Sequence, residues 1–302
     1  MGTPDFAIPS LEILLKNQYD VAAVVTAPDK PRGRGQQVSF TPVKEFSVKH
    51  SLPVLQPASL KEPSFISSLQ QIQPDLFVVV AFRILPKEVF SIPAKGAFNL
   101  HASLLPKYRG AAPINWAIIN GEKESGVTTF FLQEAVDTGT IILQARVAIG
   151  ETMTAGELHD VLADVGAEIV LQTVRLIELG KANPRSQNDT LASPAPKIFK
   201  DGCRIQWEKS SREIHNFIRG LSPYPTAWTT HDGKQLKIYR SQITAMQHSM
   251  KAGEVLVDGS ALYVGSSDGA VQILELQQEG KKRMSVAEFL RGYRFSAGVV
   301  LD

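Results

Sequence analysis

The sequence has almost no cysteine: Cys203 is the only one among 302 residues, so no disulfide can form within the chain. This scarcity fits a reducing compartment, and we expect a cytoplasmic protein. Long apolar runs are also absent, and none approaches the ~20 residues that a membrane-spanning helix needs. The start, MGTPDFAIPS, lacks the basic stretch and apolar core of a secretory signal. We therefore expect no membrane partner.

A strong excess of one charge is lacking too, because 32 Lys and Arg face 30 Asp and Glu. Hydrophobic residues make up 43% of the chain, which excludes a disordered or fibrous protein. The charge is uneven, since residues 1–196 have 17 basic against 19 acidic side chains, whereas residues 197–302 have 15 against 11. A basic second part favours a polyanionic partner such as nucleic acid, although it also fits an ordinary soluble surface.

Residues 1–180 alternate short apolar runs with helical patterns. This order is typical of an α/β domain with a doubly wound, mostly parallel sheet. Strands are predicted over 21–27, 75–82, 96–101, 126–132 and 140–147, and helices over 8–16 and 156–179. The usual first strand is apparently missing, because the first helix begins close to Met1. Either the domain lacks that strand or the chain as given starts too late.

A change in residue composition and pattern marks a second domain. Residues 181–197 are rich in Pro, Ser and Asn and are interpreted as a linker. Over 198–302, one predicted helix at 210–221 precedes short strands separated by Asp-Gly turns. Closely spaced short strands predict a small, OB-like β-barrel or a sandwich. The predicted turns are Asp232-Gly233, Asp258-Gly259 and Asp268-Gly269.

The segment FNLHASLLPKYRGAAPI (98–114) contains the candidate site. Asn99 and His101 are two residues apart on a predicted strand, so their side chains point to the same face. The following Pro and Gly residues end that strand, and open α/β sheets bind ligands at this end. An amide beside an imidazole can stabilise an oxyanion and exchange a proton. A histidine paired with a backbone group is the alternative.

Asp137 lies in the turn of EAVDTGTII, between two predicted strands. Its carboxylate can orient His101, favour the protonated imidazole and pass protons through water. Asp-Thr-Gly is also ordinary turn chemistry, and the sequence does not show that Asp137 meets His101. The SLLP segment, 103–106, is expected to form a rigid apolar wall with free backbone groups.

The stretches NLHASLLPKYRGAAPINWAI and GVTTFFLQEAVDTG closely resemble the 10-formyltetrahydrofolate-dependent formyltransferases. Segments nearly end to end resemble the branch of that family that formylates methionyl-tRNA: MGTPDFAIPSLEILL, VVTAPDKPRGRGQQVSFTPVKEF, LPVLQP, RIQWEKSSREIHNFIRGLSPYPTAW and GKKRMS. The resemblance implies transfer of the formyl group of 10-formyltetrahydrofolate to initiator methionyl-tRNA, for translation initiation. It also implies a small C-terminal barrel that binds tRNA. We expect a monomer that needs no metal, because the formyl donor is already activated.

The resemblance also implies the roles of particular residues. The catalytic set is carried over to Asn99, His101 and Asp137. The folate site is expected at Ser103, Leu104, Leu105 and Pro106, with Arg83, Ile84 and Leu85 from the turn after VVVAF. The insertion DKPRGRGQQ contacts the tRNA acceptor arm in the family, which selects Arg32 and Arg34. A dinucleotide loop does not fit there, because Val38 stands where a third glycine is required.

Two further groups have a functional and a structural interpretation. Lys281, Lys282 and Arg283 form the densest basic run and are expected to contact tRNA phosphates, although charge runs are often solvated faces. Three aromatic side chains can stack on nucleotides. They can equally belong to the core of the small domain. These are Trp207, Tyr224 and Trp228.

Three alternative functions stay open. A glycinamide ribonucleotide formyltransferase shares the catalytic residues but resembles only the part up to about residue 180. A sugar-nucleotide formyltransferase uses the same core with other appendages. A non-catalytic RNA-binding protein keeps the basic second part while the catalytic residues are idle. The resemblance itself departs at the start, where relatives have an apolar strand just before Gly-Thr-Pro-Asp-Phe.

Overall fold

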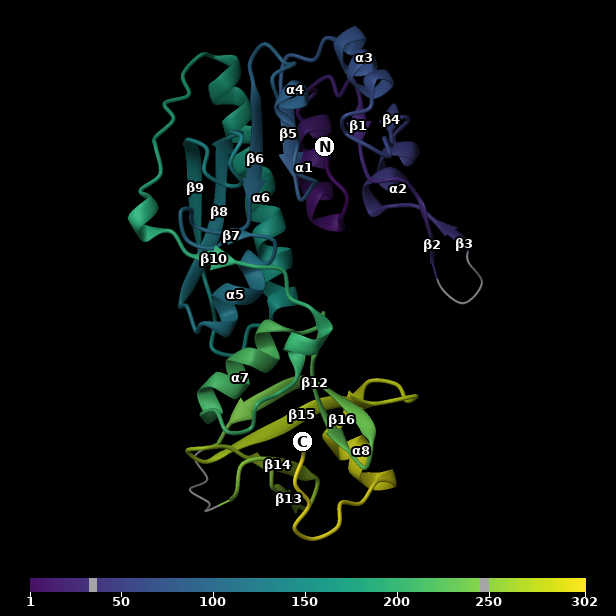
Figure 1. Ribbon diagram of the computed structural model, residues 1–302, viewed down its shortest axis with the longest axis vertical. Helices are drawn as coiled ribbons and strands as arrows, with labels where there is room; N and C mark the ends of the chain where they lie inside the picture. The colour runs from purple at the N-terminus through teal and green to yellow at the C-terminus, as the bar shows by residue number, and fades with distance from the viewer. Residues whose placement is uncertain (33–36, 245–249) are drawn as a thin grey trace. The chain divides into compact units, whose positions relative to one another are not determined.

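The computed structural model describes residues 1–32, 37–244 and 250–302, without the side chains of 31, 32, 37 and 38 (Figure 1). The chain divides into two compact units. Unit 1 comprises Met1–Gly110, Ser125–Val147 and His159–Pro194, and unit 2 comprises Ala111–Glu124, Ala148–Leu158 and Ala195–Asp302. No helix in these described ranges is long and apolar enough to cross a bilayer.

A mostly parallel sheet forms the centre of unit 1. The apolar run Phe77–Val80 forms strand β5, which pairs in parallel with β6 (Ala97–His101). On its other edge β6 pairs antiparallel with β8 (Glu124–Phe131), and β9 (Ile141–Ala148) follows (Figure 1). A short parallel pair joins β1 (Val24–Val25) to β4 (Val54–Leu55). The expected α/β class is confirmed, with a strand at 21–27 shorter than predicted.

Met1 and Gly2 stand between β1 and β5, where a first strand was expected to be missing. The Gly2 N–H donates to the Val25 carbonyl at 3.0 Å, and the Val80 N–H donates to the Met1 carbonyl at 2.9 Å. Gly2 thus forms a parallel bridge with Val80. A side chain at Gly2 does not fit, because its Cβ would lie 2.6 Å from Cβ of Ala7. The dipeptide Met1-Gly2 therefore links β1 to β5, and so joins the two parts of the sheet.

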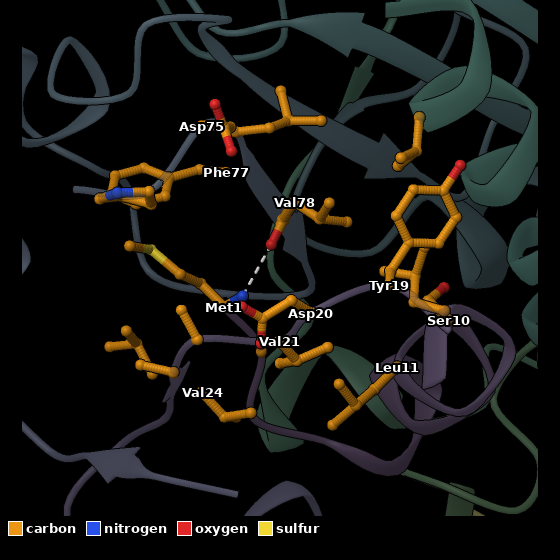
Figure 2. Close-up of a pocket in the computed structure, with 18 of the residues that line it drawn as sticks. Met1, Ser10, Leu11, Tyr19, Asp20, Val21, Val24, Asp75, Phe77 and Val78 are labelled. Atoms are coloured by element: carbon orange, nitrogen blue, oxygen red, sulfur yellow. Dashed lines mark hydrogen bonds between the residues drawn. The ribbon is translucent and has the colours of Figure 1, made fainter. Parts of the chain in front are cut away.

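A cavity of ≈ 460 Å³ continues from this bridge between the segments 20–24 and 75–78. The Met1 ammonium donates to the Val78 carbonyl at 2.7 Å across it (Figure 2). Burial lowers the pKa of this ammonium to about 5. Asp20–Ala23 line the cavity and form no strand, so β1 is limited to Val24–Val25.

Helices cover both faces of the unit 1 sheet because its strands are apolar on both sides. On one face, Leu69 and Val89 pack with Phe77 and Val79. On the other, Thr173 shares a 2.7 Å hydrogen bond with Thr129 of β8. The two helices predicted here agree with the structure within one residue. The helices are α1 (Ile8–Lys16), α2 (Pro42–Lys49), α3 (Pro63–Ile72), α4 (Lys87–Phe90) and α6 (Ala155–Glu178), with 3-10 turn η1 at Asp5–Ala7.

Unit 2 contains an antiparallel sheet whose strands follow the order β11-β12-β15-β14-β13, with β16 on β15. The expected small β domain and its Asp-Gly hairpins are confirmed. Helix α7 begins with a capping box between Ser210 and Glu213. The elements are α5 (Pro113–Ile119), α7 (Ser211–Gly220), β11 (Ala227–His231), β12 (Lys234–Ile243), β13 (Val255–Asp258), β14 (Ala261–Gly265), β15 (Ala270–Gln278), β16 (Met284–Ser285) and α8 (Val286–Gly292).

The aromatic side chains that could either stack on nucleotides or belong to the core differ in their burial within unit 2. Trp207 is 2% exposed in the core, and its Nε1–H donates to Thr229 Oγ1 at 3.1 Å. Trp228 packs partly buried against the same core. Tyr224 is 83% exposed. The core interpretation therefore holds for both tryptophans, and only Tyr224 is placed to stack on a partner.

Candidate active site

Asn99 and His101 lie at the end of β6, as predicted. Asn99 pairs in register with Val79 of β5 and Phe130 of β8, so its strand is in the interior of the sheet. The side chains of Asn99 and His101 share one face because they are two residues apart on the strand. Within the described residues the half-buried Asn99 carboxamide has no hydrogen-bond partner. Its donors and its oxygen are therefore free for a substrate.

The His101 imidazole is held by a backbone group on one side only. Its Nε2 lies 2.8 Å from the Tyr108 carbonyl oxygen, and the residue is 6% exposed. A carbonyl can only accept, so Nε2 carries a proton. The alternative of a backbone-paired histidine is thus correct for Nε2. The other nitrogen, Nδ1, lies 3.8 Å from Oδ2 of Asp137.

Asp137 reaches His101 from a tight turn. Its φ of +55° is in the left-handed region, which aspartate adopts more readily than most residues. Its Oδ2 accepts a 2.9 Å hydrogen bond from the Gly110 N–H, and its side chain is 11% exposed. The structure therefore brings together the three residues that the sequence proposed as catalytic.

The SLLP segment forms a fixed wall, but several of its backbone groups, which were expected to be free, are hydrogen-bonded. The Ser103 carbonyl accepts from Thr128 Oγ1 at 2.6 Å, and the Leu105 N–H donates to that hydroxyl at 3.1 Å. The Leu105 carbonyl accepts from Gln144 Nε2 at 2.9 Å. Ser103 Oγ donates to the Lys107 carbonyl at 2.6 Å. These polar groups hold the loop to β8 and β9, because buried backbone groups need partners.

The remaining predicted folate residues differ in exposure. Leu104 and Pro106 are half-buried, on either side of the buried Leu105. Ile84 is 72% exposed, whereas Leu85 is 7% exposed. The segment 83–85 borders an open cavity of ≈ 610 Å³ that residues 58–61, 83–88, 90 and 134 line.

Arg83 uses part of its guanidinium inside the chain. It donates to the carbonyls of Pro57 at 2.9 Å and of Ala58 at 3.0 Å. Its Nε is buried and has no partner in the described part of the chain. Arg83 therefore fixes the wall of this cavity and leaves its buried Nε–H unused.

The predicted tRNA residues are only partly described. Arg32 ends the β2 strand (Lys30–Arg32), which pairs with β3 (Gln37–Ser39), but its side chain and the whole of Arg34 lie outside the described residues. Lys281 and Lys282 are exposed in unit 2.

Arg283 is engaged within unit 2. Its Nε and Nη2 donate to the two carboxylate oxygens of Glu275 at 2.6 and 2.5 Å. Its guanidinium also lies 4.2 Å from the centre of the Tyr239 ring. The Glu275 hydrogen bonds raise the pKa of Arg283. Because its charge is already paired, Arg283 is a weaker candidate phosphate ligand than the two lysines beside it.

Sequence reasoning missed the groups that hold the catalytic residues. The Tyr108 carbonyl and the Gly110 N–H come from the KYRG segment, which includes the short strand β7 (Arg109–Gly110). Both residues have positive φ, +61° and +126°. The glycine was the only local sign of this conformation, since backbone atoms carry no signature in a sequence. Within the described residues no group of three or more His, Cys, Asp or Glu is placed to hold a metal ion.

Comparisons with known proteins agree with this geometry. Residues 1–174 match the family described as formyl transferase, and residues 197–294 match the formyl transferase C-terminal domain. A methionyl-tRNA formyltransferase of Bacteroides thetaiotaomicron is 47% identical over 312 residues, covering 100% of this chain and 97% of the relative. That of Chlorobium phaeovibrioides is 48% identical over 306 residues, covering 99% and 96%.

A solved structure shares the fold. The N-formyltransferase from Helicobacter canadensis, in complex with folinic acid and dTDP-3-aminofucose, superimposes with a TM-score of 0.68 at 24% identity. The match covers 94% of this chain and 97% of that chain. With both domain matches and full-length relatives above 45% identity, the chain belongs to the formyl transferase family.

Proposed function

We propose that the protein transfers the formyl group of 10-formyltetrahydrofolate to the α-amine of initiator methionyl-tRNA and releases tetrahydrofolate. The observation that carries this proposal is the meeting of His101 and Asp137 at the end of β6. The full-length relatives are named methionyl-tRNA formyltransferases, which supports the choice of acceptor. The neighbour bound to folinic acid supports a folate donor.

In the proposed reaction the α-amine nitrogen attacks the formyl carbon, and the formyl oxygen becomes an oxyanion. The unpartnered Asn99 carboxamide donates to that oxyanion, and the positive charge of the protonated His101 ring stabilises it electrostatically. Protonation at Nδ1 of His101 places an N–H opposite Asp137. The Asp137 carboxylate stabilises the positive charge of the protonated His101 ring, because opposite charges at this distance attract each other in a buried site.

Proton transfer completes the proposed reaction. Asp137 removes the ammonium proton of the intermediate, directly or through a water. The bond between the formyl carbon and N10 then breaks, and N10 receives the proton that Asp137 removed, so tetrahydrofolate leaves and the carboxylate is regenerated. The products are N-formylmethionyl-tRNA and tetrahydrofolate. Losing one positioned oxyanion donor typically costs ~10²–10³ in rate.

We assign the substrates to surfaces of each unit. The folate is assigned to the SLLP wall and to the segment 83–85, both in unit 1. The tRNA is assigned to Arg32 and Arg34 and to the basic side chains Lys281, Lys282 and Arg283 of unit 2. The enzyme is proposed to act in the cytoplasm as a monomer.

Transfer of labelled formyl from 10-formyltetrahydrofolate tests the proposal. The acceptors are initiator methionyl-tRNA, an elongator methionyl-tRNA and an amino-sugar nucleotide. We expect label on the initiator tRNA, with one tetrahydrofolate released per formyl transferred. His101→Ala should formylate this tRNA at no more than ~1% of the wild-type rate. Label on the sugar nucleotide alone, or near-normal formylation by His101→Ala, would overturn the assignment.

A further inference from the structure

The segment 185–193, interpreted from its composition as part of a linker, crosses the turns that hold the catalytic residues. Arg185 and Ile141 exchange two backbone hydrogen bonds at 2.8 Å, next to the turn of Asp137. At the other end, Ser193 accepts from the N–H groups of Tyr108 and Arg109, both at 2.9 Å. This crossing segment therefore joins the turn at 137–139 to the backbone at 108–110, all within unit 1.

Gln187 is the central contact of the crossing segment. Its Nε2 donates to the carbonyls of Asp137 and Gly139, both at 2.8 Å. A primary amide has two N–H bonds, so these contacts use both. Its Oε1 accepts from Nε and Nη2 of Arg109 at 3.1 and 2.7 Å. Because a guanidinium can only donate, Arg109 fixes which end of the amide faces the turn.

The contact acts on the catalytic carboxylate through its own main chain. Asp137 is in a left-handed conformation that costs free energy unless its surroundings hold it. Gln187 holds its carbonyl, while the Gly110 N–H holds its Oδ2. The turn is tight, since a Cβ at Gly139 would lie 1.7 Å from the Phe131 carbonyl oxygen. Losing the Gln187 donors leaves two carbonyls of this turn without partners.

We propose that Gln187, oriented by Arg109, is a positioning residue that keeps the Asp137 carboxylate directed at His101. The inference rests on the proposed function, because it concerns the same carboxylate. Gln187→Glu is the sharpest variant, since a carboxylate retains the volume and pairs with Arg109. It has no N–H, however, and its oxygens repel the carbonyls of Asp137 and Gly139.

Steady-state kinetics and hydrogen exchange test this assignment. For Gln187→Glu we expect kcat to fall about 10-fold or more, because a small misplacement of a catalytic group can cost up to ~10²-fold. KM for the folate and for methionyl-tRNA should stay within about two-fold, since binding contacts are untouched. Amide exchange in residues 137–141 should become faster. Gln172→Glu, on the exposed face of α6, is the matched control and should change none of these quantities.

A double variant separates positioning from a general structural effect. In an Asp137→Asn background, Gln187→Glu should lower kcat little further, because both changes act on one group. Additive losses, or unchanged kcat and exchange in Gln187→Glu, overturn the inference. If the wild-type chain formylates no methionyl-tRNA, the proposed function fails by itself, and the exchange of residues 137–141 then decides whether Gln187 holds the turn.

Discussion

Nδ1 of His101 lies 3.8 Å from Oδ2 of Asp137, and two residues of the KYRG segment, Tyr108 and Gly110, hold the two side chains in place. The Tyr108 carbonyl accepts from His101 Nε2, and the Gly110 N–H donates to Asp137 Oδ2. The separation is longer than a hydrogen bond, but it suits an ion pair that closes or admits a water during the reaction. The KYRG segment thus sets the geometry of the dyad without contributing a catalytic side chain.

Asp137→Asn tests the role of the carboxylate in this dyad. The amide keeps the shape but removes the charge and the proton acceptor, so kcat should fall by ~10²–10⁴. KM for both substrates should change little. The measurement is single-turnover transfer of labelled formyl. Asp164→Asn, on exposed helix surface, is the matched control, and an equal loss there would argue for an unspecific effect.

Arg34→Ala tests the basic insertion after β1, whose tip lies outside the described residues. We expect a higher KM for methionyl-tRNA with KM for the folate unchanged, because a cation near phosphate contributes to binding rather than to chemistry. Initial rates over a range of each substrate measure both values. Equal effects on the two substrates would contradict this role.

Lys281 and Lys282 are expected to bind tRNA more strongly than Arg283 does. Alanine at both lysines should raise KM for tRNA and reduce the salt dependence of binding by a slope of about 1–2, as expected for up to two lost phosphate contacts. Arg283→Ala should have a smaller effect, because Glu275 already pairs its charge. Binding titrations at several salt concentrations give the slopes. A larger loss for Arg283→Ala would reverse this ranking.

Apolar residues fused ahead of Met1 should fill the cavity beside it. A fused segment of Val residues can pair with the facing backbone of 20–24 and 75–78, and it removes the buried ammonium. A gain of ~2 kcal/mol, the burial of one large apolar side chain, would raise Tm by about 4 °C or more. Thermal unfolding measures the shift against a Gly-Ser fusion of equal length. If both fusions melt together, the cavity does not accept a strand.

We expect the buried His215 to make unit 2 sensitive to acid. Burial lowers the pKa of His215, and Arg219 and Arg212 lower it further, whereas its hydrogen bond to the Glu151 carbonyl opposes them. The unfolded chain therefore takes up the proton first as pH falls below 6.5. Stability is complete above that pH and is lost as pH falls towards the lower, folded pKa.

Urea unfolding at about pH 7.5 and about pH 5.5 measures this dependence. His215→Gln should be less stable at the higher pH but should lose less stability on acidification. His50→Gln, at an exposed position, is the control and should keep the wild-type dependence. A wild-type slope retained in His215→Gln would show that another group is responsible.

Local patterns in the sequence correctly predicted much of the fold. The Asp-Gly turns predicted the hairpins of unit 2, since few residues tolerate the positive φ found at Asp232 and Gly233. The alternation of a strand predicted that Asn99 and His101 share a face. These features depend on neighbouring residues, whose spacing the chain itself sets. The shortness of β1 was not predictable, because a strand also requires a partner along its whole edge.

The amino-acid sequence by itself determined three of the helices, at 8–16, 156–179 and 210–221, together with the hairpins of unit 2 and the side-chain chemistry of the site. Only the tertiary structure decided that Asp137 faces His101, that Tyr108 and Gly110 hold the pair, and that Gln187 supports the turn from a segment interpreted as a linker. The physical reason is that these contacts join backbone atoms of residues far apart in the chain. Every residue has such atoms, so no residue type indicates which of them will meet.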